Sequence, residues 1–294
     1  MSEICSVTRV PYAEEWLRTF TSSMRGVWLD PVFHFFTLFG SEFFFIAIFI
    51  VGLHLTKPKL FSELALLVCG SALMNSSLKG WFMECRPLSV IHLVKETGFS
   101  FPSGHALAAS AFWGLLFWRT TKVWQKSLFL LLIVLIAISR PYLGVHYLHD
   151  IAVGTILGFS LSWVFQRWGS VLQTRSPKLL LVLAIGLLMS FLNPRESFKH
   201  FGAFAGFIIG GLICSQIGLA AENFEKKTHI LAFGISVFGA VVFWWGLKVL
   251  FLSFGFESPL LGLVRYFFLA LWISFCSPFF AERLEQSRKL RLYN

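Results

Sequence analysis

Charge is scarce in this sequence: Asp, Glu, Lys and Arg make up 14% of its 294 residues, whereas 56% of them are hydrophobic. The mean hydropathy of +0.72 exceeds what a soluble domain of this length needs to form a core. Low-complexity tracts and convincing internal repeats are missing. The chain does not start with a basic segment, a short apolar core and a small-residue cleavage site, so we expect no removable signal peptide.

Cysteine is also scarce. The five cysteines include no CxxC pair and no metal-ligand spacing, so the sequence predicts no metal site built on them. Cys69, Cys214 and Cys276 lie in apolar runs, where free cysteine behaves as a small hydrophobic residue. An odd count gives no disulfide framework, and a bond between Cys5 and Cys85 is the less favoured alternative.

The sequence has many long apolar runs. Nine of them are long enough, or nearly so, to cross a bilayer as helices, which takes about 20 residues. They lie near residues 32–54, 60–78, 103–118, 127–139, 151–166, 177–192, 201–220, 229–250 and 259–280. The third and fourth runs are short and end at polar clusters, so these clusters are expected at or slightly inside the membrane interface. The sequence therefore predicts an all-α, multi-pass membrane protein with about nine transmembrane helices.

The net charge of +10 does not indicate nucleic-acid binding, because its distribution follows the membrane. If the chain crosses nine times from an outer N-terminus, fourteen Lys and Arg residues fall on one side and eight on the other. The positive-inside rule places the side with fourteen in the cytoplasm. The loops at 79–102 and 140–150 then face a periplasm, the cell exterior or a lumen.

We expect three parts along the chain. Residues 1–30 form an N-terminal interfacial segment, because residues 11–28 place apolar side chains on one helical face among charges. A floppy tail is the open alternative for this segment. Residues 31–170 form a core that carries the polar clusters, and residues 171–294 add four further transmembrane helices.

Three polar clusters fall on the predicted outer side, within residues 79–87, 101–105 and 139–150. Lys79, Arg86 and Arg140 supply positive charge and donors that suit the oxygens of a phosphate. Ser103 and Gly104 precede a predicted helix, so their backbone N–H groups are expected to point at an anion. The sequence therefore predicts a phosphate-binding site assembled from distant segments.

Two histidines and an aspartate supply the reactive groups. His146 and Asp150 are four residues apart, so we expect them as neighbours on one helical face. The carboxylate would hold one imidazole nitrogen as N–H and leave the other free as a nucleophile. His105 could protonate a leaving alkoxide and later activate water. These parts predict phosphoryl transfer without a metal ion or other cofactor.

Each cluster alone has a plainer interpretation. Lys79 and Arg86 could be ordinary interfacial residues, and His146 with Asp150 could be a helix-stabilising pair. The joint occurrence of all three clusters on one side favours a common site. Three other polar residues of these loops are interpreted as solvated bystanders: Glu84, Lys95 and His149.

The pattern K-x6-R-P, P-S-G-H and S-R-x5-H-x3-D resembles the three-part signature of the type 2 phosphatidic acid phosphatase superfamily. The matching residues are Lys79, Arg86, Pro87, Pro102, Ser103, Gly104, His105, Ser139, Arg140, His146 and Asp150. The resemblance covers about residues 25–167. Vanadium-dependent haloperoxidases are similar in site, but they are soluble, and the predicted membrane spans argue against that assignment.

The resemblance implies an all-helical membrane core that hydrolyses a phosphomonoester or diphosphate through a phosphohistidine. His146 would be the nucleophile, Asp150 would orient it, and His105 would be the acid. The implied phosphate ligands are Lys79, Arg86, Arg140, Ser103 and the amide of Gly104.

We expect a lipid phosphate phosphatase in a bacterial inner membrane, with its active site facing the periplasm or exterior. Its partners would be a lipid phosphate or diphosphate and the surrounding membrane lipids, and the oligomeric state is left open. A phosphatase for soluble sugar phosphates and a lipid phosphotransferase remain alternatives. The four extra spans leave a lipid transporter as a third alternative.

Overall fold

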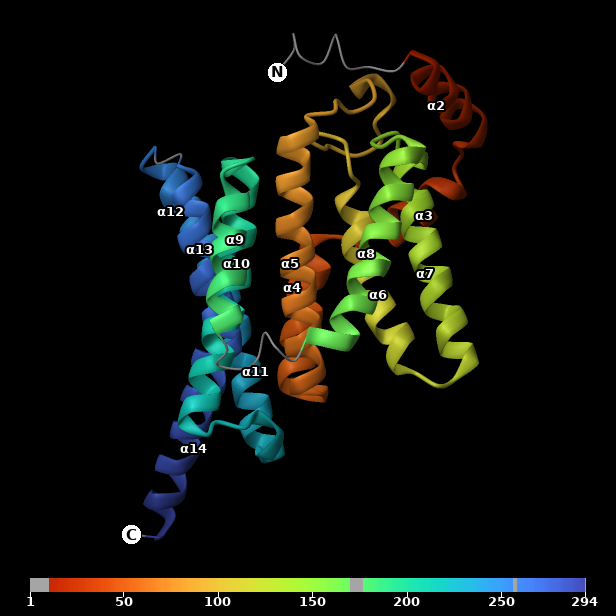
Figure 1. The fold of residues 1–294 in the computed structure, drawn as a ribbon. Coiled ribbons are helices and arrows are strands. Elements are labelled where there is room, and N and C mark those ends of the chain that lie inside the picture. The colour runs from red at the N-terminus through yellow and green to blue at the C-terminus, as the bar shows by residue number, and fades with distance from the viewer. Residues whose placement is uncertain (1–10, 170–176, 256–257, 294) are drawn as a thin grey trace. The chain divides into compact units, whose positions relative to one another are not determined.

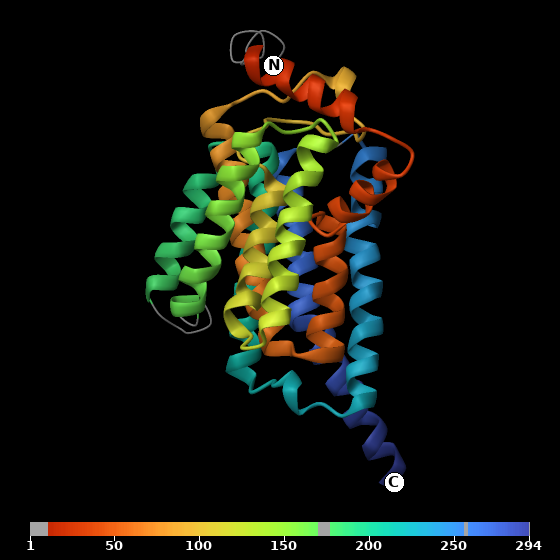
Figure 2. The ribbon, with the colours of Figure 1, turned by 90° about the vertical axis from the view of Figure 1, so that its right-hand side faces the viewer.

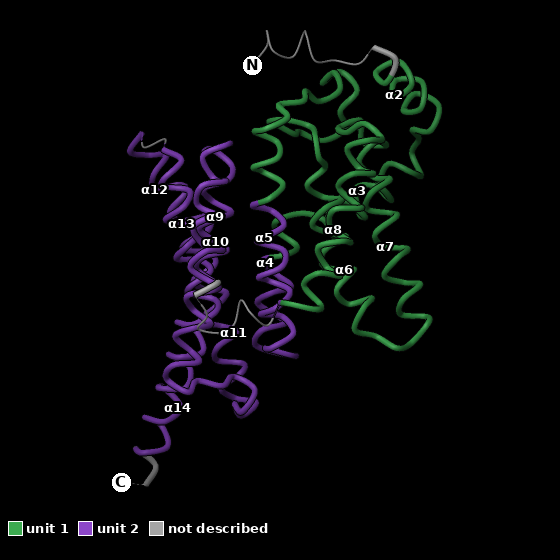
Figure 3. Tube along the Cα trace, in the orientation of Figure 1, with its two compact units in different colours: residues 1–45, 74–168 green, residues 46–73, 169–294 purple. Residues whose placement is uncertain are grey.

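The computed structural model describes residues 11–169, 177–255 and 258–293. All regular secondary structure within these ranges is helical, as the sequence predicted (Figure 1). The chain divides into two compact units (Figure 3). Unit 1 comprises residues 1–45 and 74–168, and unit 2 comprises residues 46–73 and 169–294.

Unit 1 is a helical bundle in which α6 packs against both α7 and α8 (Figure 1). Its elements are α2 (Pro11–Met24), α3 (Leu29–Leu38), the start of α4 (Glu42–Val51), the end of α5 (Pro58–Phe82), a 3-10 turn (Ser89–Ile91), α6 (Gly104–Arg119), α7 (Val123–Tyr142) and α8 (Leu148–Trp168). Glycines let α8 approach α6 closely. A Cβ on Gly154 would lie 2.7 Å from the Ser103 carbonyl oxygen, and one on Gly158 would lie 2.2 Å from that of Leu107.

Helix α2 lies across one end of unit 1, over the loop that joins α5 to α6 (Figures 1 and 2). Its buried Leu17 packs against Ile91 and Tyr147. The Glu14 carboxylate accepts the Leu88 N–H at 3.1 Å and the Tyr147 hydroxyl at 2.7 Å. Residues 11–24 therefore form a packed helix and not a floppy tail, while their position at a membrane interface stays a prediction.

Unit 2 contains the rest of the helices. They are the end of α4 with a π-helical turn (Gly52–Thr56), the start of α5, α9 (Pro177–Ser190), α10 (Pro194–Ile217), a 3-10 turn (Ala221–Asn223), α11 (Lys226–Ala240), a π-helical segment (Val241–Gly246), α12 (Leu247–Ser253), α13 (Pro259–Leu271), a second π-helical segment (Trp272–Cys276) and α14 (Ser277–Tyr293). Helix α10 packs along α13. A Cβ on Gly202 would lie 2.2 Å from the Leu263 carbonyl oxygen, so only glycine allows this approach.

Local signals explain several helix ends in unit 2. Pro194 takes the first position of α10, where a missing N–H costs no hydrogen bond. Gly218 ends that helix in the left-handed conformation with φ of 70°. Helix α13 starts with Pro259, and the Ser258 hydroxyl accepts the Leu260 N–H at 3.3 Å.

The chain is a multi-pass membrane protein. Six helical segments of its described part are long and apolar enough to cross a bilayer: Pro58–Phe82, Val123–Tyr142, Leu148–Trp168, Pro194–Ile217, Lys226–Ser253 and Pro259–Leu290. A seventh is obtained if α3 and the α4 segment, which are bent by 54° at their break, form one span. Helix α6 has 16 residues and the apolar part of α9, Leu179–Ser190, is also short. The predicted number of nine spans is therefore not confirmed.

The structure corrects two expectations on local structure. Cys85 is buried and disulfide-bonded, contrary to the favoured expectation of free cysteines, and the proposed partner Cys5 lies outside the described residues. Helix α7 extends to Tyr142, so Arg140 lies in its last turn and not in a loop.

Candidate functional site

The predicted site residues come from helix ends and loops of unit 1. Lys79 lies in the last turn of α5, His105 in the first turn of α6, and Arg140 in the last turn of α7. Arg86 and His146 lie in the loops that precede α6 and α8, respectively. The remaining three predicted residues are Ser103, Gly104 and Asp150, at the starts of α6 and α8. The hydrogen bonds described below connect the three sequence clusters.

His146 and Asp150 form the central pair. The His146 Nδ1 lies 3.0 Å from Asp150 Oδ2, and both side chains are buried. The two residues do not share a helical face, as the sequence had suggested, because α8 begins only at Leu148. Instead, Asp150 Oδ2 also accepts the Tyr147 N–H at 2.9 Å, which fixes the turn before the helix. The carboxylate thus holds Nδ1 as N–H and leaves Nε2 as the free nitrogen.

Arg86 faces that free nitrogen. Its Nη1 lies 3.0 Å from His146 Nε2 and donates to the Val145 carbonyl at 3.0 Å. Burial lowers the pKa of His146 well below its usual value, and the nearby Arg86 lowers the pKa further. The imidazole is therefore neutral near pH 7, with a lone pair on Nε2 beside a guanidinium group.

Glu96 lies between the two predicted phosphate-binding arginines. Its Oε1 is 2.5 Å from Arg140 Nη2, and its Oε2 is 3.4 Å from Arg86 Nη2. Burial alone would raise the pKa of Glu96, but the two arginines outweigh burial and lower the pKa. The carboxylate thus occupies a position where two guanidinium groups converge on one anion. The sequence interpretation did not include Glu96, because nothing in its spacing links it to the three motifs.

Lys79 and Asn75 tie α5 to the segment before α6. The Lys79 ammonium donates to the Phe99 carbonyl at 2.5 Å and to the Ser100 carbonyl at 3.3 Å. The Asn75 amide donates to the Pro102 carbonyl at 3.0 Å. These bonds place the start of α6 beside the last turns of α5.

The start of α6 differs in one respect from the expected anion site. The Ser103 N–H donates to the Asp150 carbonyl at 3.0 Å, so it does not point at a free anion as expected. The buried Ser103 hydroxyl, in contrast, has no hydrogen-bond partner in the described part of the chain. His105 follows Gly104 in the first turn, and a Cβ on Gly40 would lie 3.0 Å from its imidazole ring. Of the two donors of Ser103, only the hydroxyl is therefore free of a hydrogen bond within the described part of the chain.

Ser100 and His149 contact the central pair, Glu84 contacts His149, and none of the three was predicted. The buried Ser100 hydroxyl donates to Asp150 Oδ2 and lies 3.3 Å from His146 Nδ1. His149 Nε2 lies 2.5 Å from Glu84 Oε1 and 3.2 Å from Asp150 Oδ1. Glu84 lies between Lys79 and Arg86 of the first motif, and His149 lies between His146 and Asp150 of the third. This position within the motifs is the only sequence feature that could have pointed to them. Both side chains are partly exposed, as the interpretation of solvated residues required, but they also form ion pairs beside the central pair.

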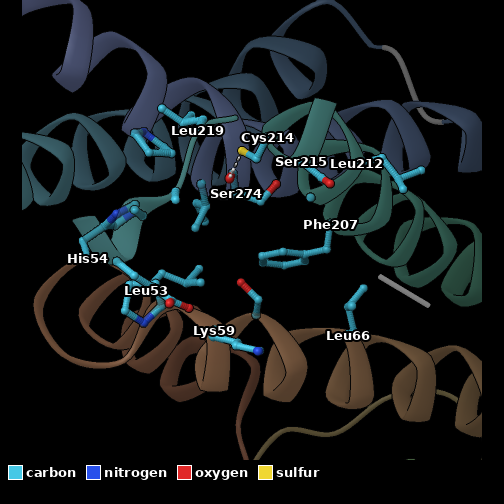
Figure 4. A pocket seen from close by; sticks show the side chains of 18 of the residues that line it. Leu53, His54, Lys59, Leu66, Phe207, Leu212, Cys214, Ser215, Leu219 and Ser274 are labelled. Atoms are coloured by element: carbon cyan, nitrogen blue, oxygen red, sulfur yellow. Dashed lines mark hydrogen bonds between the residues drawn. The ribbon is translucent and has the colours of Figure 1, made fainter. Parts of the chain in front are cut away.

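Unit 2 holds a separate cavity of about 400 Å³ between α5, α10 and the α13–α14 region (Figure 4). Phe207 reaches into it from α10, opposite Lys59 and Leu66 on α5 (Figure 4). Buried His54 on its wall lies 2.6 Å from the Ser236 hydroxyl. The lining is mostly apolar and contains none of the three motifs. The phosphate chemistry predicted from the sequence therefore belongs to unit 1.

The fold and the site define a multi-pass membrane phosphatase, and comparison with known proteins identifies the family. Residues 61–173 match the PAP2 superfamily, and residues 198–289 match the transmembrane extension of PAP2 superfamily phosphatases. The chain belongs to the PAP2 superfamily, as the three motifs indicated. The match to the transmembrane extension also gives the C-terminal helices a counterpart in other phosphatases.

Two relatives and one solved structure illustrate the similarity. Phosphatidylglycerophosphatase B of Bacillus subtilis is 31% identical over 165 residues, which cover 52% of this chain and 81% of that protein. Undecaprenyl-diphosphatase of Sulfolobus acidocaldarius is 39% identical over 70 residues, which cover 24% of this chain and 32% of that protein. The crystal structure of a transmembrane PAP2-type phosphatidylglycerolphosphate phosphatase from Bacillus subtilis is 30% identical, with a TM-score of 0.47, and covers 54% of this chain and 85% of that one.

Proposed function

We propose that this protein hydrolyses a phosphomonoester or diphosphate of a membrane lipid through a phosphohistidine on His146. The observation that carries the proposal is the arrangement around that imidazole. Asp150 holds its Nδ1 at 3.0 Å, while its Nε2 lies 3.0 Å from the Arg86 guanidinium, which can bind an anion beside the nucleophile.

Phosphate binding would use the groups around Nε2. Arg86 and Arg140 would exchange the Glu96 carboxylate for two phosphate oxygens. The Ser103 hydroxyl and the Gly104 amide at the start of α6 would donate to the remaining oxygens, with the positive end of the helix dipole behind them. Lys79 would add charge from α5. These protein cations would stabilise the transition state, so the proposed reaction needs no metal ion.

The reaction would proceed in two displacements. His146 Nε2 attacks phosphorus, the bond to the leaving oxygen breaks, and His105 gives that oxygen a proton. In the second step His105 takes a proton from water as the water oxygen attacks the phosphohistidine. The phosphorus–nitrogen bond then breaks, and inorganic phosphate leaves the site.

Two observations support a site that faces outward from the cytoplasm. The more numerous lysines and arginines lie in loops on the opposite side of the membrane from the three motifs in the predicted topology. Cys85, next to Arg86, is disulfide-bonded, and disulfides persist mainly in oxidising compartments. We therefore propose a bacterial inner membrane with the site on the periplasmic or exterior face.

A lipid substrate is supported by the membrane location and by the names of the relatives, which are phosphatases of phosphatidylglycerophosphate and undecaprenyl diphosphate.

We also keep as proposals the division into residues 1–30, 31–170 and 171–294, and the nine membrane crossings. Hydrolysis of a soluble sugar phosphate and transfer to a lipid acceptor stay alternatives within the same chemistry.

Phosphate release by the purified protein tests the proposal. The substrates are phosphatidylglycerophosphate, phosphatidic acid, undecaprenyl diphosphate and a soluble sugar phosphate, each with and without EDTA. We expect release from at least one lipid, unchanged by EDTA and abolished in His146→Ala. Loss of activity in EDTA would contradict the metal-free mechanism, and full activity of His146→Ala would contradict the assignment of the nucleophile.

A further inference from the structure

Glu84, His149 and Asp150 meet on the side of the Asp150 carboxylate that faces away from His146. His149 Nε2 lies 2.5 Å from Glu84 Oε1 and 3.2 Å from Asp150 Oδ1. One nitrogen and two carboxylate oxygens from these residues all lie within 4.8 Å of one another. The group therefore offers three ligand atoms around one point.

The His149 ring lies close to two aromatic rings. It stacks on Tyr147 with a centroid distance of 5.6 Å and an interplanar angle of 10°. The Phe101 ring lies 5.8 Å away by centroids. These contacts fix the direction of Nε2 toward the two carboxylates.

Hydrogen bonding leaves one buried oxygen of this group unsatisfied. Three donors serve Asp150 Oδ2: the His146 Nδ1, the Tyr147 N–H and the Ser100 hydroxyl. The other oxygen, Oδ1, has no hydrogen-bond partner among the described residues, although Asp150 is 0% exposed. Nε2 of His149 carries at most one hydrogen, and the shorter contact directs it to Glu84. A buried carboxylate oxygen without a donor is unfavourable unless a cation satisfies it.

We propose that Glu84, His149 and Asp150 bind a divalent transition-metal ion of the zinc class, and that this ion inhibits the phosphatase. The inhibitory part rests on the proposed function. An imidazole nitrogen with two carboxylate oxygens suits zinc, whereas magnesium prefers oxygen ligands alone. With bonds of about 2.1 Å, tetrahedral zinc places its ligands roughly 3.4 Å apart, which lies within the 4.8 Å that encloses the three ligand atoms.

The ion would reach the site from the exposed side. The side chains of His149 and Glu84 are 42% and 22% exposed, respectively. The ion would take the place of a hydrogen on His149 Nε2, and water would take the fourth position.

Inhibition follows from the position of Asp150 between the two sites. Its Oδ1 would bind the ion, while its Oδ2 continues to hold His146 Nδ1. A bound dication draws negative charge from the carboxylate, so Asp150 stabilises positive charge on the imidazole less well. The His146 nucleophile and its phosphohistidine would both become less favourable.

Zinc binding to the purified full-length protein tests the site directly, with ZnCl2 titrated calorimetrically in the absence of substrate. We expect one bound ion in the wild type and binding at least about tenfold weaker in Glu84→Gln and in His149→Gln. His92→Gln is the matched control, because His92 lies in the same α5–α6 loop but bonds the Pro87 carbonyl at 3.0 Å. The site is refuted if the wild type binds no zinc or if neither substitution weakens binding.

Inhibition of phosphate release tests the coupling. We expect the zinc concentration for half-inhibition to rise at least about tenfold in Glu84→Gln relative to its own zinc-free activity, and to stay unchanged in His92→Gln. Zinc that binds through Glu84 and His149 without slowing hydrolysis refutes the inhibitory role. A protein that binds zinc as expected but hydrolyses no phosphate substrate refutes the proposed function and leaves the metal site intact.

Discussion

The guanidinium of Arg86 lies 3.0 Å from Nε2 of His146, the imidazole nitrogen that faces away from Asp150. This contact places a fixed positive charge at the atom that would attack phosphorus. After burial, it is the next cause that lowers the pKa of the imidazole, and it would also provide a donor for the oxygens of an incoming phosphate. In the proposed mechanism, one arginine would therefore act on both the nucleophile and the phosphate.

The pH dependence of hydrolysis reports on this contact. Protonated His146 cannot attack, so activity falls as the pH drops through the pKa of His146. Burial and then Arg86 lower that pKa, which places the acidic limb of kcat/KM below the usual histidine pKa of 6.5. Removing the charge with Arg86→Gln raises the pKa, so we expect the limb to move to higher pH. An acidic limb that stays in place in Arg86→Gln would show that Arg86 does not act on His146.

Substitution of Asp150 tests the orientation of the nucleophile. Asp150→Asn keeps the size of the side chain but can present an amide N–H to His146 Nδ1, which favours the wrong tautomer. In a hydrolase triad the corresponding change lowers kcat by about 10⁴, and we expect a loss of at least about 10³ here. Single-turnover phosphate release measures the effect, and thermal unfolding in detergent checks that the variant is folded. A loss below tenfold would contradict the role of Asp150.

Glu96 should compete with phosphate for the two arginines. Its carboxylate contacts Arg140 at 2.5 Å and Arg86 at 3.4 Å, so an entering phosphate must displace it. In Glu96→Gln the arginines lose this competing charge, and we expect inorganic phosphate or orthovanadate to inhibit at least about threefold more strongly. Glu15 is an exposed residue of α2, so Glu15→Gln removes one carboxylate elsewhere in unit 1 and serves as the control. Weaker inhibition in Glu96→Gln would mean that the carboxylate positions the arginines.

Some residues that contact the predicted site could not be found from the sequence, and the cause is physical. Lys79, His105 and Arg140 could be predicted because each stands in a motif whose spacing limits the chemistry it can do. Glu96 and Ser100 could not be predicted, since their roles depend on how the loop between α5 and α6 folds back onto α7 and α8.

The pair of His146 and Asp150 was predicted from the spacing of a helix, yet a turn before α8 brings the two together. A separation of four residues can place an imidazole next to a carboxylate in a turn as well as in a helix. The predicted pairing is therefore correct, although the predicted local structure is not. The helices could be predicted from the apolar runs, but the number of bilayer crossings could not. The length of a short or bent helix does not show whether it crosses the bilayer.

The close contact between α6 and α8 positions the start of α6, and Gly154 permits it. A Cβ at this position would lie 2.7 Å from the Ser103 carbonyl oxygen, a backbone atom that can move only with the helix. Gly154→Ala should therefore displace Ser103 and lower both stability, by about 1–3 kcal/mol, and kcat. Gly234→Ala in α11 is the matched control, because nothing lies within 4 Å of its added Cβ. Alanine has the higher helix propensity, so the control should unfold at the same or a higher temperature. Thermal unfolding and phosphate release are measured on both variants. Equal stability of Gly154→Ala and Gly234→Ala would contradict the role of Gly154 in the contact.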